Sequence, residues 1–279
     1  MSEFAPALSL VTSLVTALLY AYALKLQWPK QRSSAAGLQN SATTQTEQRT
    51  RWVVLVALLG HAFSCHQILF SDGGGQLSLL YVANVVALII TLVVLVAAFR
   101  LPVARLFLLV IPIGLVALLL SVLVEPGVTE SHSLTGPLLA HILISLAAYS
   151  ALMLAACQSV LLAILDKRLK TPGKQTSQWM PPLETMEQLL LAMLWIGLTL
   201  LTASIISGFL FLEDMFAQNV SHHIVITSLS WLVYAFFLTG RYAFGWRGLT
   251  AVRWTLVAFT LLVVGYLGSK FVLEYILQR

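Results

Sequence analysis

The chain has 279 residues, of which 59% are hydrophobic and 10% charged, and its mean hydropathy is +0.89. Soluble domains are about 45–50% apolar and about 25% charged, so this composition excludes a soluble globular enzyme, a disordered protein and a disulfide-rich scaffold. The net charge of +5 would suggest nucleic-acid binding in a soluble domain. Here the basic residues must first be tested against membrane topology.

The apolar residues lie in eight blocks, each long enough to cross a bilayer core of about 30 Å at about 1.5 Å per residue. Their continuous apolar runs lack the alternation of a strand, so they predict helices. We therefore predict an all-α fold, a polytopic membrane helix bundle of eight transmembrane helices that forms a single integral membrane domain over residues 1–279. The blocks are Phe4–Leu24, Trp52–Phe70, Leu77–Phe99, Ala104–Val124, Pro137–Leu165, Glu184–Leu212, His222–Gly240 and Thr250–Leu277.

The loops between these blocks alternate in charge. The loops after the first, third, fifth and seventh blocks, together with the first four residues of the blocks that follow them, hold all but two of the 16 Lys and Arg residues. The loops after the second, fourth and sixth blocks hold no basic residue and carry acids instead. By the positive-inside rule the basic loops are cytoplasmic and both termini lie outside. Because topology accounts for the basic residues, no basic surface is left for a nucleic-acid partner.

The polar stretch over residues 25–51 is rich in Ser, Thr, Gln and Ala, which predicts a flexible cytoplasmic linker between the first and second helices. The first block lacks a basic segment before it and an Ala-x-Ala exit, so we expect a retained helix and not a cleaved signal peptide. Cys65 and Cys157 both fall inside blocks, which predicts neither a disulfide framework nor a redox pair.

Histidines are the polar residues inside the blocks that hydropathy does not explain. An ionisable side chain within a bilayer is costly, and by default it faces the bundle interior and has a function. His61 lies about 14 Å from the cytoplasmic edge of the second block at about 1.5 Å per residue. His141 enters the fifth block near the outer face, and His222 and His223 open the seventh. The other two, which lie at an interface or in a loop and carry a smaller desolvation cost, are His66 and His132.

All 6 histidines are thus predicted at the midplane or on the outer side. Imidazoles among apolar walls suit axial ligation of haem iron or binding of a divalent metal ion. We predict His61, His141 and His223 as ligands of a haem b iron, with His222 as the alternative to His223 and Lys270 as a cation for the propionates. The simpler interpretation is that the histidines hydrogen-bond neighbouring helices and that Lys270 snorkels to the interface.

No catalytic constellation is present in the sequence, which contains no H-E-x-x-H, no zinc-spaced Cys/His run, no Gly-rich phosphate loop and no Ser/His/Asp set. We therefore expect no enzymatic activity of its own. Two other functions stay open. One is a transporter, or a transporter subunit, for a divalent metal ion or small solute. The other is a structural assembly partner whose small residues, such as Ser207-Gly208 and Gly265-x-x-Gly268, pack helices.

The segments around these histidines resemble the CcsA/CcmC-type haem-handling membrane proteins of cytochrome c assembly, and more closely a bacterial inner-membrane branch of that family. The resemblance is strongest from Gly136 to the C-terminus. It implies that His141 is an outward-facing haem ligand, and that haem taken from the membrane is presented on the periplasmic side to a membrane or periplasmic protein partner. The residues that carry it are His141–Tyr149, Leu165–Arg168, Pro182–Glu184, Gly197, Ser207-Gly208, Trp231–Tyr234, Gly245–Gly248 and Gly265–Lys270.

The sequence also departs from the family pattern. The tryptophan-rich outer segment should lie between Gly208 and Trp231, where this chain has no tryptophan. Thr239 and Lys270 stand where the family has histidines, and His223 begins the segment that aligns with another family motif. The resemblance therefore implies a multi-pass protein of the bacterial inner membrane that binds haem through a different histidine set, without the standard platform for haem delivery.

Overall fold

The computed structural model describes residues 4–27, 39–69, 78–124, 136–170, 181–211 and 221–272, together with residue 276. All regular elements in these ranges are helices, which confirms the predicted all-α class. The chain divides into two compact units, Met1–His132 and Ser133–Arg279. They are called unit 1 and unit 2.

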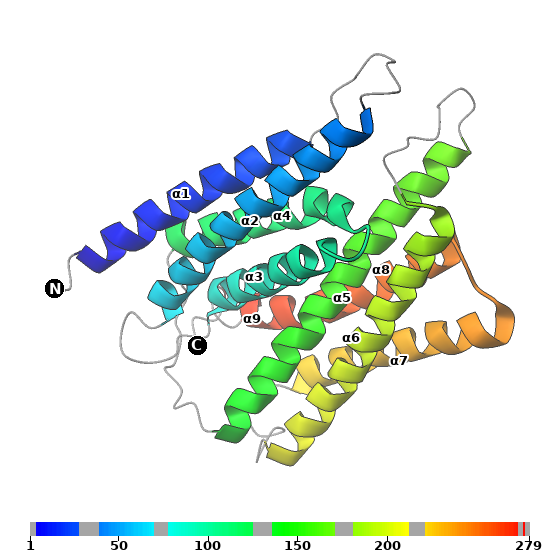
Figure 1. Ribbon diagram of the computed structural model, residues 1–279. Coiled ribbons are helices and arrows are strands. Elements are labelled where there is room, and N and C mark those ends of the chain that lie inside the picture. The colour runs from blue at the N-terminus through cyan, green and yellow to red at the C-terminus, as the bar shows by residue number, and fades with distance from the viewer. Residues whose placement is uncertain are drawn as a thin grey trace. The chain divides into compact units, whose positions relative to one another are not determined.

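Unit 1 contains four long helices, coloured from blue to green in Figure 1. Helix α1 packs against α2 and α4, and α3 packs against the same two helices. Each helix therefore shields an apolar face against two neighbours, and its buried positions recur every three or four residues, as in the stripe Ala87, Ile90 and Val94 of α3. The elements are α1 (Phe4–Gln27), α2 (Gln39–Leu69), α3 (Leu79–Ala98), the 3₁₀ turn η1 (Ala104–Leu106) and α4 (Phe107–Leu123).

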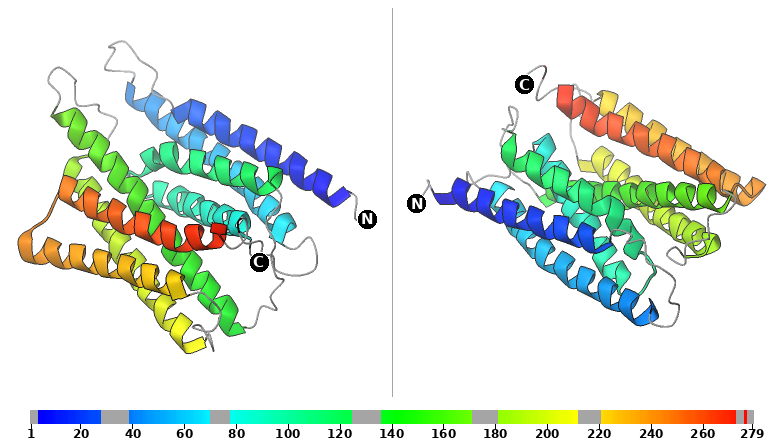
Figure 2. Two further views of the ribbon diagram at one scale, coloured as in Figure 1. Left: turned by 180° about the vertical axis from the view of Figure 1, so that it is seen from behind. Right: turned by 90° about the horizontal axis from the view of Figure 1, so that it is seen from above.

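Unit 2 repeats this order of neighbours. Helix α5 packs against α6 and α8, and α7 packs against the same two helices. Figure 2 shows α7 and α8 lying side by side from two further directions. The elements are α5 (Gly136–Leu169), α6 (Leu183–Phe211), α7 (Ser221–Phe244), α8 (Leu249–Val263), the π-helical turn η2 (Val264–Gly268) and α9 (Ser269–Phe271).

The turn between α7 and α8 depends on two glycines. Gly245 and Gly248 have φ angles of 67° and 58°, a region that residues with a side chain rarely adopt. Arg241 donates from Nη1 to the carbonyl oxygen of Trp246 at 2.8 Å, and Gly248 donates its N–H to Glu187 Oε1 at 2.8 Å. The turn is therefore tied both to the end of α7 and to the start of α6.

Seven helical segments in the described ranges are long and apolar enough to cross a membrane. Exposed apolar side chains, such as Leu18 at 71% and Leu210 at 70%, are what faces directed at lipid require. Helix α2 is not among these seven segments, although its half from Trp52 onward is largely apolar. The segments are Ser9–Gln27, Leu79–Ala98, Ala104–Leu123, Gly136–Leu169, Leu183–Leu210, Ile224–Phe244 and Leu249–Gly268.

Two elements differ in extent from the sequence-based expectation. Helix α2 begins at Gln39, so the stretch predicted as a flexible linker over residues 25–51 is helical at both of its ends, and its middle lies outside the described residues. Good helix formers and the Glu47–Arg51 pair at 3.7 Å favour this extension. The last predicted block is also divided, because α8 gives way to the π turn η2 at Val264.

Candidate functional site

His61 is the centre of a buried polar network in unit 1. It lies on α2, and its side chain is 0% exposed. Its Nδ1 is 3.0 Å from the hydroxyl of Tyr20 on α1, and its Nε2 is 2.8 Å from Oδ1 of Asn84 on α3. One imidazole therefore connects three helices of the unit.

The partners of His61 determine its tautomer. Asn84 donates from Nδ2 to Cys65 Sγ at 3.3 Å, so its Oδ1 is directed at His61 and accepts a hydrogen bond from Nε2–H. Nδ1 then holds the lone pair and accepts a hydrogen bond from the Tyr20 hydroxyl. Both ring nitrogens of His61 are used by protein partners, and an iron or other metal ion could bind Nδ1 only in place of Tyr20.

Close approach of α1 and α2 supports this network. A Cβ atom at Gly60 would collide with the side chain of Thr16, so α1 lies against the backbone of α2 at this level. Next to it, the hydroxyls of Ser13 and Ser64 are 2.5 Å apart and buried. Hydroxyl pairs and small residues are the usual contacts between helices in a membrane.

His141 of unit 2 has a different environment. It lies on α5, is half-buried, and its Nδ1 is 2.9 Å from Ser207 Oγ on α6. Ser207 donates to the carbonyl oxygen of Ser204 at 2.9 Å. Ser145 donates to the carbonyl oxygen of His141 at 2.7 Å and lies 2.7 Å from Ser204 Oγ. A short ladder of hydroxyls therefore fixes the imidazole and the backbone around it.

The tautomer of His141 follows from the single proton of Ser207. Because that proton is donated to the Ser204 carbonyl, Ser207 Oγ accepts a hydrogen bond from Nδ1–H of His141. The lone pair then lies on Nε2, for which the described residues provide no side-chain partner, while the ring also has a hydrogen bond with the backbone of Ser204. A histidine whose one nitrogen donates to a protein oxygen while the other is open has the arrangement typical of a metal ligand.

The other predicted site residues are placed only in part. His222 and His223 lie in the first turn of α7, but their side chains, like His132 as a whole, lie outside the described residues. His66 is exposed on α2, and Lys270 is half-buried in α9 and already interacts with a neighbour. Within the described residues, no three His, Cys, Asp or Glu side chains form a group that could hold a metal ion. Whether His61 or His141 can bind a ligand therefore depends on the hydrogen-bond partners of each imidazole.

Several residues that carry the family resemblance are packing contacts. A Cβ atom at Gly197 on α6 would overlap the side chain of Leu152 on α5, and one at Gly265 would lie 3.0 Å from Ile226 on α7. Trp231 on α7 donates from Nε1 to Thr202 Oγ1 on α6 at 2.8 Å. These residues hold the four helices of unit 2 together around α5 and α6.

Three side chains that define these two sites were not predicted from the sequence. Tyr20 and Asn84 complete the network around His61, and Ser207 fixes the tautomer of His141. Asn84 could have been found, because it is the one carboxamide in the otherwise apolar helix Leu79–Ala98 and polar residues in lipid seek partners. For Ser207, the only indication in the sequence was its small size, which predicted a helix-packing contact and not a hydrogen bond to His141.

The model of the family described as "Cytochrome C assembly protein" matches residues 50–277, a match that covers most of both units. The chain belongs to the cytochrome c assembly protein family. This finding confirms the resemblance seen in the motifs around His141, Gly197 and Trp231.

The chain is also similar to individual proteins. The chain is 31% identical over 224 residues to "Inner membrane protein YpjD" of Escherichia coli strain K12, which covers 80% of this chain and 85% of the relative. YpjD represents the inner-membrane branch expected from the sequence. The chain is also 28% identical over 140 residues to "Uncharacterized 28.8 kDa protein in nifR3-like 5'region" of Azospirillum brasilense, which covers 49% of this chain and 52% of that protein. No solved structure matches the chain.

Proposed function

We propose that this protein binds haem b in the bacterial inner membrane, with Nε2 of His141 as an axial ligand of the iron. The observation that carries the proposal is the 2.9 Å contact between His141 Nδ1 and Ser207 Oγ, since it leaves the Nε2 lone pair available. Membership of the cytochrome c assembly protein family supports haem as the ligand. The name of the YpjD relative supports the location.

The donor set and its surroundings fit a haem. Leu138 and Ile144 lie three residues before and after His141 on the same face of α5 and are half-buried, so the imidazole lies next to apolar side chains, as an apolar porphyrin requires. We propose His223, with His222 as its alternative, as the second ligand, because both lie in the first turn of α7. Lys270 would pair with a propionate. When bound, the haem supplies an iron centre that can bind ligands or carry an electron.

His61 has a different proposed role. Its two ring nitrogens already accept from Tyr20 and donate to Asn84, so a haem at this position requires that the network opens. We propose that His61 locks α1, α2 and α3 together in the resting protein, and that it serves as a second ligand site only if Tyr20 withdraws.

The proposed topology has eight spans with both termini outside. It counts the half of α2 from Trp52 onward as the second span, in which Tyr20 and Asn84 satisfy the buried imidazole of His61. The distribution of Lys and Arg then directs the Gly136 end of α5, and therefore His141, to the periplasmic side. From there the haem would be available to a membrane or periplasmic protein partner. We propose no catalytic step by this chain itself.

The optical spectrum of the purified protein tests the proposal. We expect the wild-type protein from haem-replete membranes to show a Soret band and reduced α-band, and the His141→Ala variant to lose them. His66→Ala is the matched control, because it removes an exposed histidine and should leave the spectrum unchanged. A colourless wild-type protein that takes up no added haemin, or a normal spectrum of His141→Ala, contradicts the proposal.

The same preparation separates haem binding from the alternative function. An open histidine nitrogen beside Ser145 and Ser204 would also suit a divalent metal ion on a transport path. That alternative predicts a colourless protein that retains a divalent metal ion and releases it in His141→Ala. Haem binding predicts pigment, with iron and porphyrin in equal amounts.

A further inference from the structure

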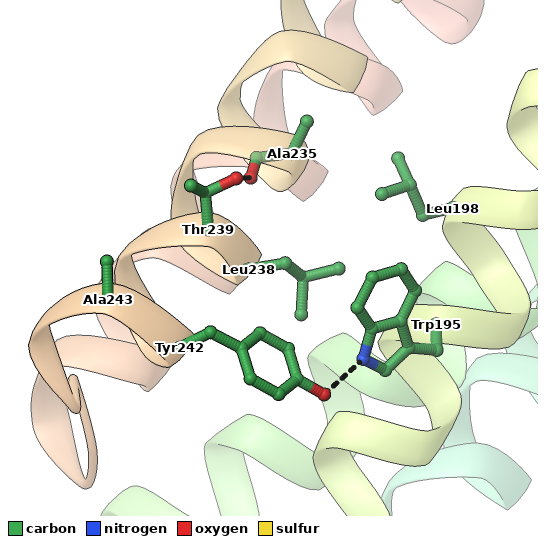
Figure 3. A pocket seen from close by; sticks show the side chains of 7 residues that line it. All are labelled: Trp195, Leu198, Ala235, Leu238, Thr239, Tyr242 and Ala243. Carbon is green, nitrogen blue, oxygen red and sulfur yellow. Dashed lines mark hydrogen bonds between the residues drawn. The ribbon is translucent and has the colours of Figure 1, made fainter.

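Unit 2 has a groove on its surface between α6 and α7, independent of the histidine site (Figure 3). Its volume is about 660 Å³. Leu198 and Leu238 form its apolar base and are 8% and 2% exposed. Trp195 and Tyr242 stand at one end, where the indole N–H of Trp195 donates to the Tyr242 hydroxyl at 3.2 Å. The groove is therefore apolar along its length and polar at that end.

The sequence of α7 explains why this space is open. The positions that line it include Ala235, Thr239 and Ala243, which recur at helical spacing and have short side chains. Figure 1 shows α6 and α7 separating toward the Leu183 end of α6 and the Phe244 end of α7. Small residues on a diverging pair of helices leave a channel that an extended aliphatic chain can fill.

Two of the three arginines on α7, α8 and the turn between them have no ion pair among the described residues. Arg241 is paired with Glu187 at 3.8 Å. Arg247 and Arg253, which follow on the turn and the start of α8, are exposed and have no ion pair in the described part of the chain. Ala243 at the end of the groove is only four residues before Arg247. Because the turn begins where the groove ends along α7, these two exposed guanidinium groups offer positive charge to an anionic group at that level.

Aromatic rings mark this end as a membrane interface. Trp246 and Trp254 stack with ring centroids 5.7 Å apart and an interplanar angle of 2°, and Phe236 packs edge-on against both. Tryptophan and tyrosine gather at the level of lipid headgroups. The distribution of basic loops assigns this level to the cytoplasmic leaflet, which carries anionic lipids.

We propose that the groove between α6 and α7 binds one anionic phospholipid. An acyl chain lies along Leu198 and Leu238, the ester region contacts the Trp195–Tyr242 pair, and the phosphate pairs with Arg247 and Arg253. The apolar channel and the two unpaired arginines each select one part of such a molecule. A zwitterionic lipid satisfies the channel and leaves the arginines without net compensation.

Native mass spectrometry of the detergent-purified protein tests this assignment, with phosphatidylglycerol and phosphatidylcholine of the same acyl chains as probes. We expect the wild-type protein to retain phosphatidylglycerol in preference. Each of Arg247→Gln and Arg253→Gln should lower that preference about fivefold, as expected for one basic residue near an anionic membrane surface. The matched control is Arg168→Gln, an exposed arginine at the end of α5, which should leave it unchanged.

Two further variants test the apolar groove itself. Thr239→Leu fills it modestly, and Ala235→Phe fills it further. Both should lower the retention of both lipids, and an unchanged thermal midpoint of the lipid-free protein shows that the variant is folded. Equal retention of the two lipids by the wild-type protein would overturn the proposal. So would a double arginine variant that keeps the wild-type preference, or a folded Thr239→Leu variant that retains both lipids fully.

Discussion

Unit 1 and unit 2 each place a histidine inside a four-helix arrangement with the same order of neighbours, yet the two imidazoles differ in what they have left to bind. His61 is fully buried, and both of its nitrogens are satisfied by Tyr20 and Asn84. His141 is half-buried, and one nitrogen is held by Ser207 while the other has no side-chain partner among the described residues. The partners of the ring, more than its depth, separate a structural histidine from a candidate ligand.

The chemical reason lies in the type of partner. A carboxamide and a phenol hydroxyl together complement both the donor and the acceptor of a neutral imidazole. A serine whose proton is already donated to a carbonyl can only accept, so it fixes one tautomer and leaves the opposite lone pair open. The difference predicts that changes in unit 1 alter stability and that changes around His141 alter ligand binding.

The largest expected effect on stability follows from His61→Ala. The change removes a 0% exposed ring and leaves the Tyr20 hydroxyl and Asn84 carboxamide without their partner, at a cost of about 2–4 kcal/mol. We expect a clear fall in the thermal midpoint of the protein in detergent. His66→Ala on the same helix should stay within about 0.5 kcal/mol of the wild-type protein. Equal midpoints for the two variants would remove the distinction between the units.

A second comparison concerns the glycines at helix contacts. At Gly197, a methyl group would meet Cγ and Cδ2 of Leu152 and approach a backbone nitrogen, so Gly197→Ala should cost about 1–3 kcal/mol. At Gly60, the one close atom would be the Thr16 hydroxyl oxygen, which can turn away by a rotamer change that breaks its hydrogen bond to the Thr12 carbonyl oxygen, at a cost of about 1 kcal/mol. Gly60→Ala should cost less than about 1 kcal/mol, because alanine also has the better helix propensity. Thermal midpoints measured in the same detergent should therefore rank Gly197→Ala as the less stable variant.

The fold was largely accessible from the sequence, because lipid imposes long apolar runs that are visible without any homologue. The expected blocks at Leu77–Phe99 and Ala104–Val124 lie within about two residues of helical segments. The start of α2 was not predicted, because the apolar run begins only at Trp52. The polar residues from Gln39 to Arg51 still have good helix propensity and extend the helix. The division of the last helix at Val264 likewise leaves no mark in hydropathy.

The site was accessible only to the level of individual residues. The cost of a polar side chain in lipid predicted that His61 is buried, and it is. Its partners could not be predicted, because Tyr20 and Asn84 are 41 and 23 residues away in the chain, and the rotation of each helix is set by packing. Ser207 was noticed as a small packing residue, whereas its hydrogen bond to His141 depends on the register between α5 and α6.

Ser207→Ala tests the tautomer argument at His141, on the assumption that haem binds there. Without an acceptor for Nδ1–H the imidazole is free to rotate, so we expect haem affinity to fall about tenfold, the lower range for the loss of a residue that orients a metal ligand. Ser207→Thr keeps the hydroxyl and should retain most of the affinity. Haemin titration followed by absorbance measures both. An affinity of Ser207→Ala equal to that of the wild-type protein would show that Ser207 does not orient the ligand.

The smallest expected effects on stability come from removing an ion pair. The ion pairs of the two units differ in which elements they connect. Glu187 of unit 2 joins separate elements, since it pairs with Arg241 of α7 at 3.8 Å and accepts the N–H of Gly248. Glu47 of unit 1 pairs with Arg51 of its own helix at 3.7 Å and is well exposed. Glu187→Gln keeps an oxygen for Gly248 and loses the charge, so it should cost about 0.5–1 kcal/mol, against about 0.3 kcal/mol for Glu47→Gln.

Salt separates these two variants further. The Glu47–Arg51 pair is exposed and should be screened, so the small difference between Glu47→Gln and wild type should vanish at about 1 M salt, where the Debye length is about 3 Å. The Glu187–Arg241 pair is 14% and 13% exposed and is screened less, so part of the Glu187→Gln difference should persist. If the thermal midpoints of both variants converge on wild type at high salt, the pair that ties α6 to α7 contributes no more than a surface contact. The Glu187–Arg241 ion pair would then not be needed to hold α6 and α7 together at the end of the groove.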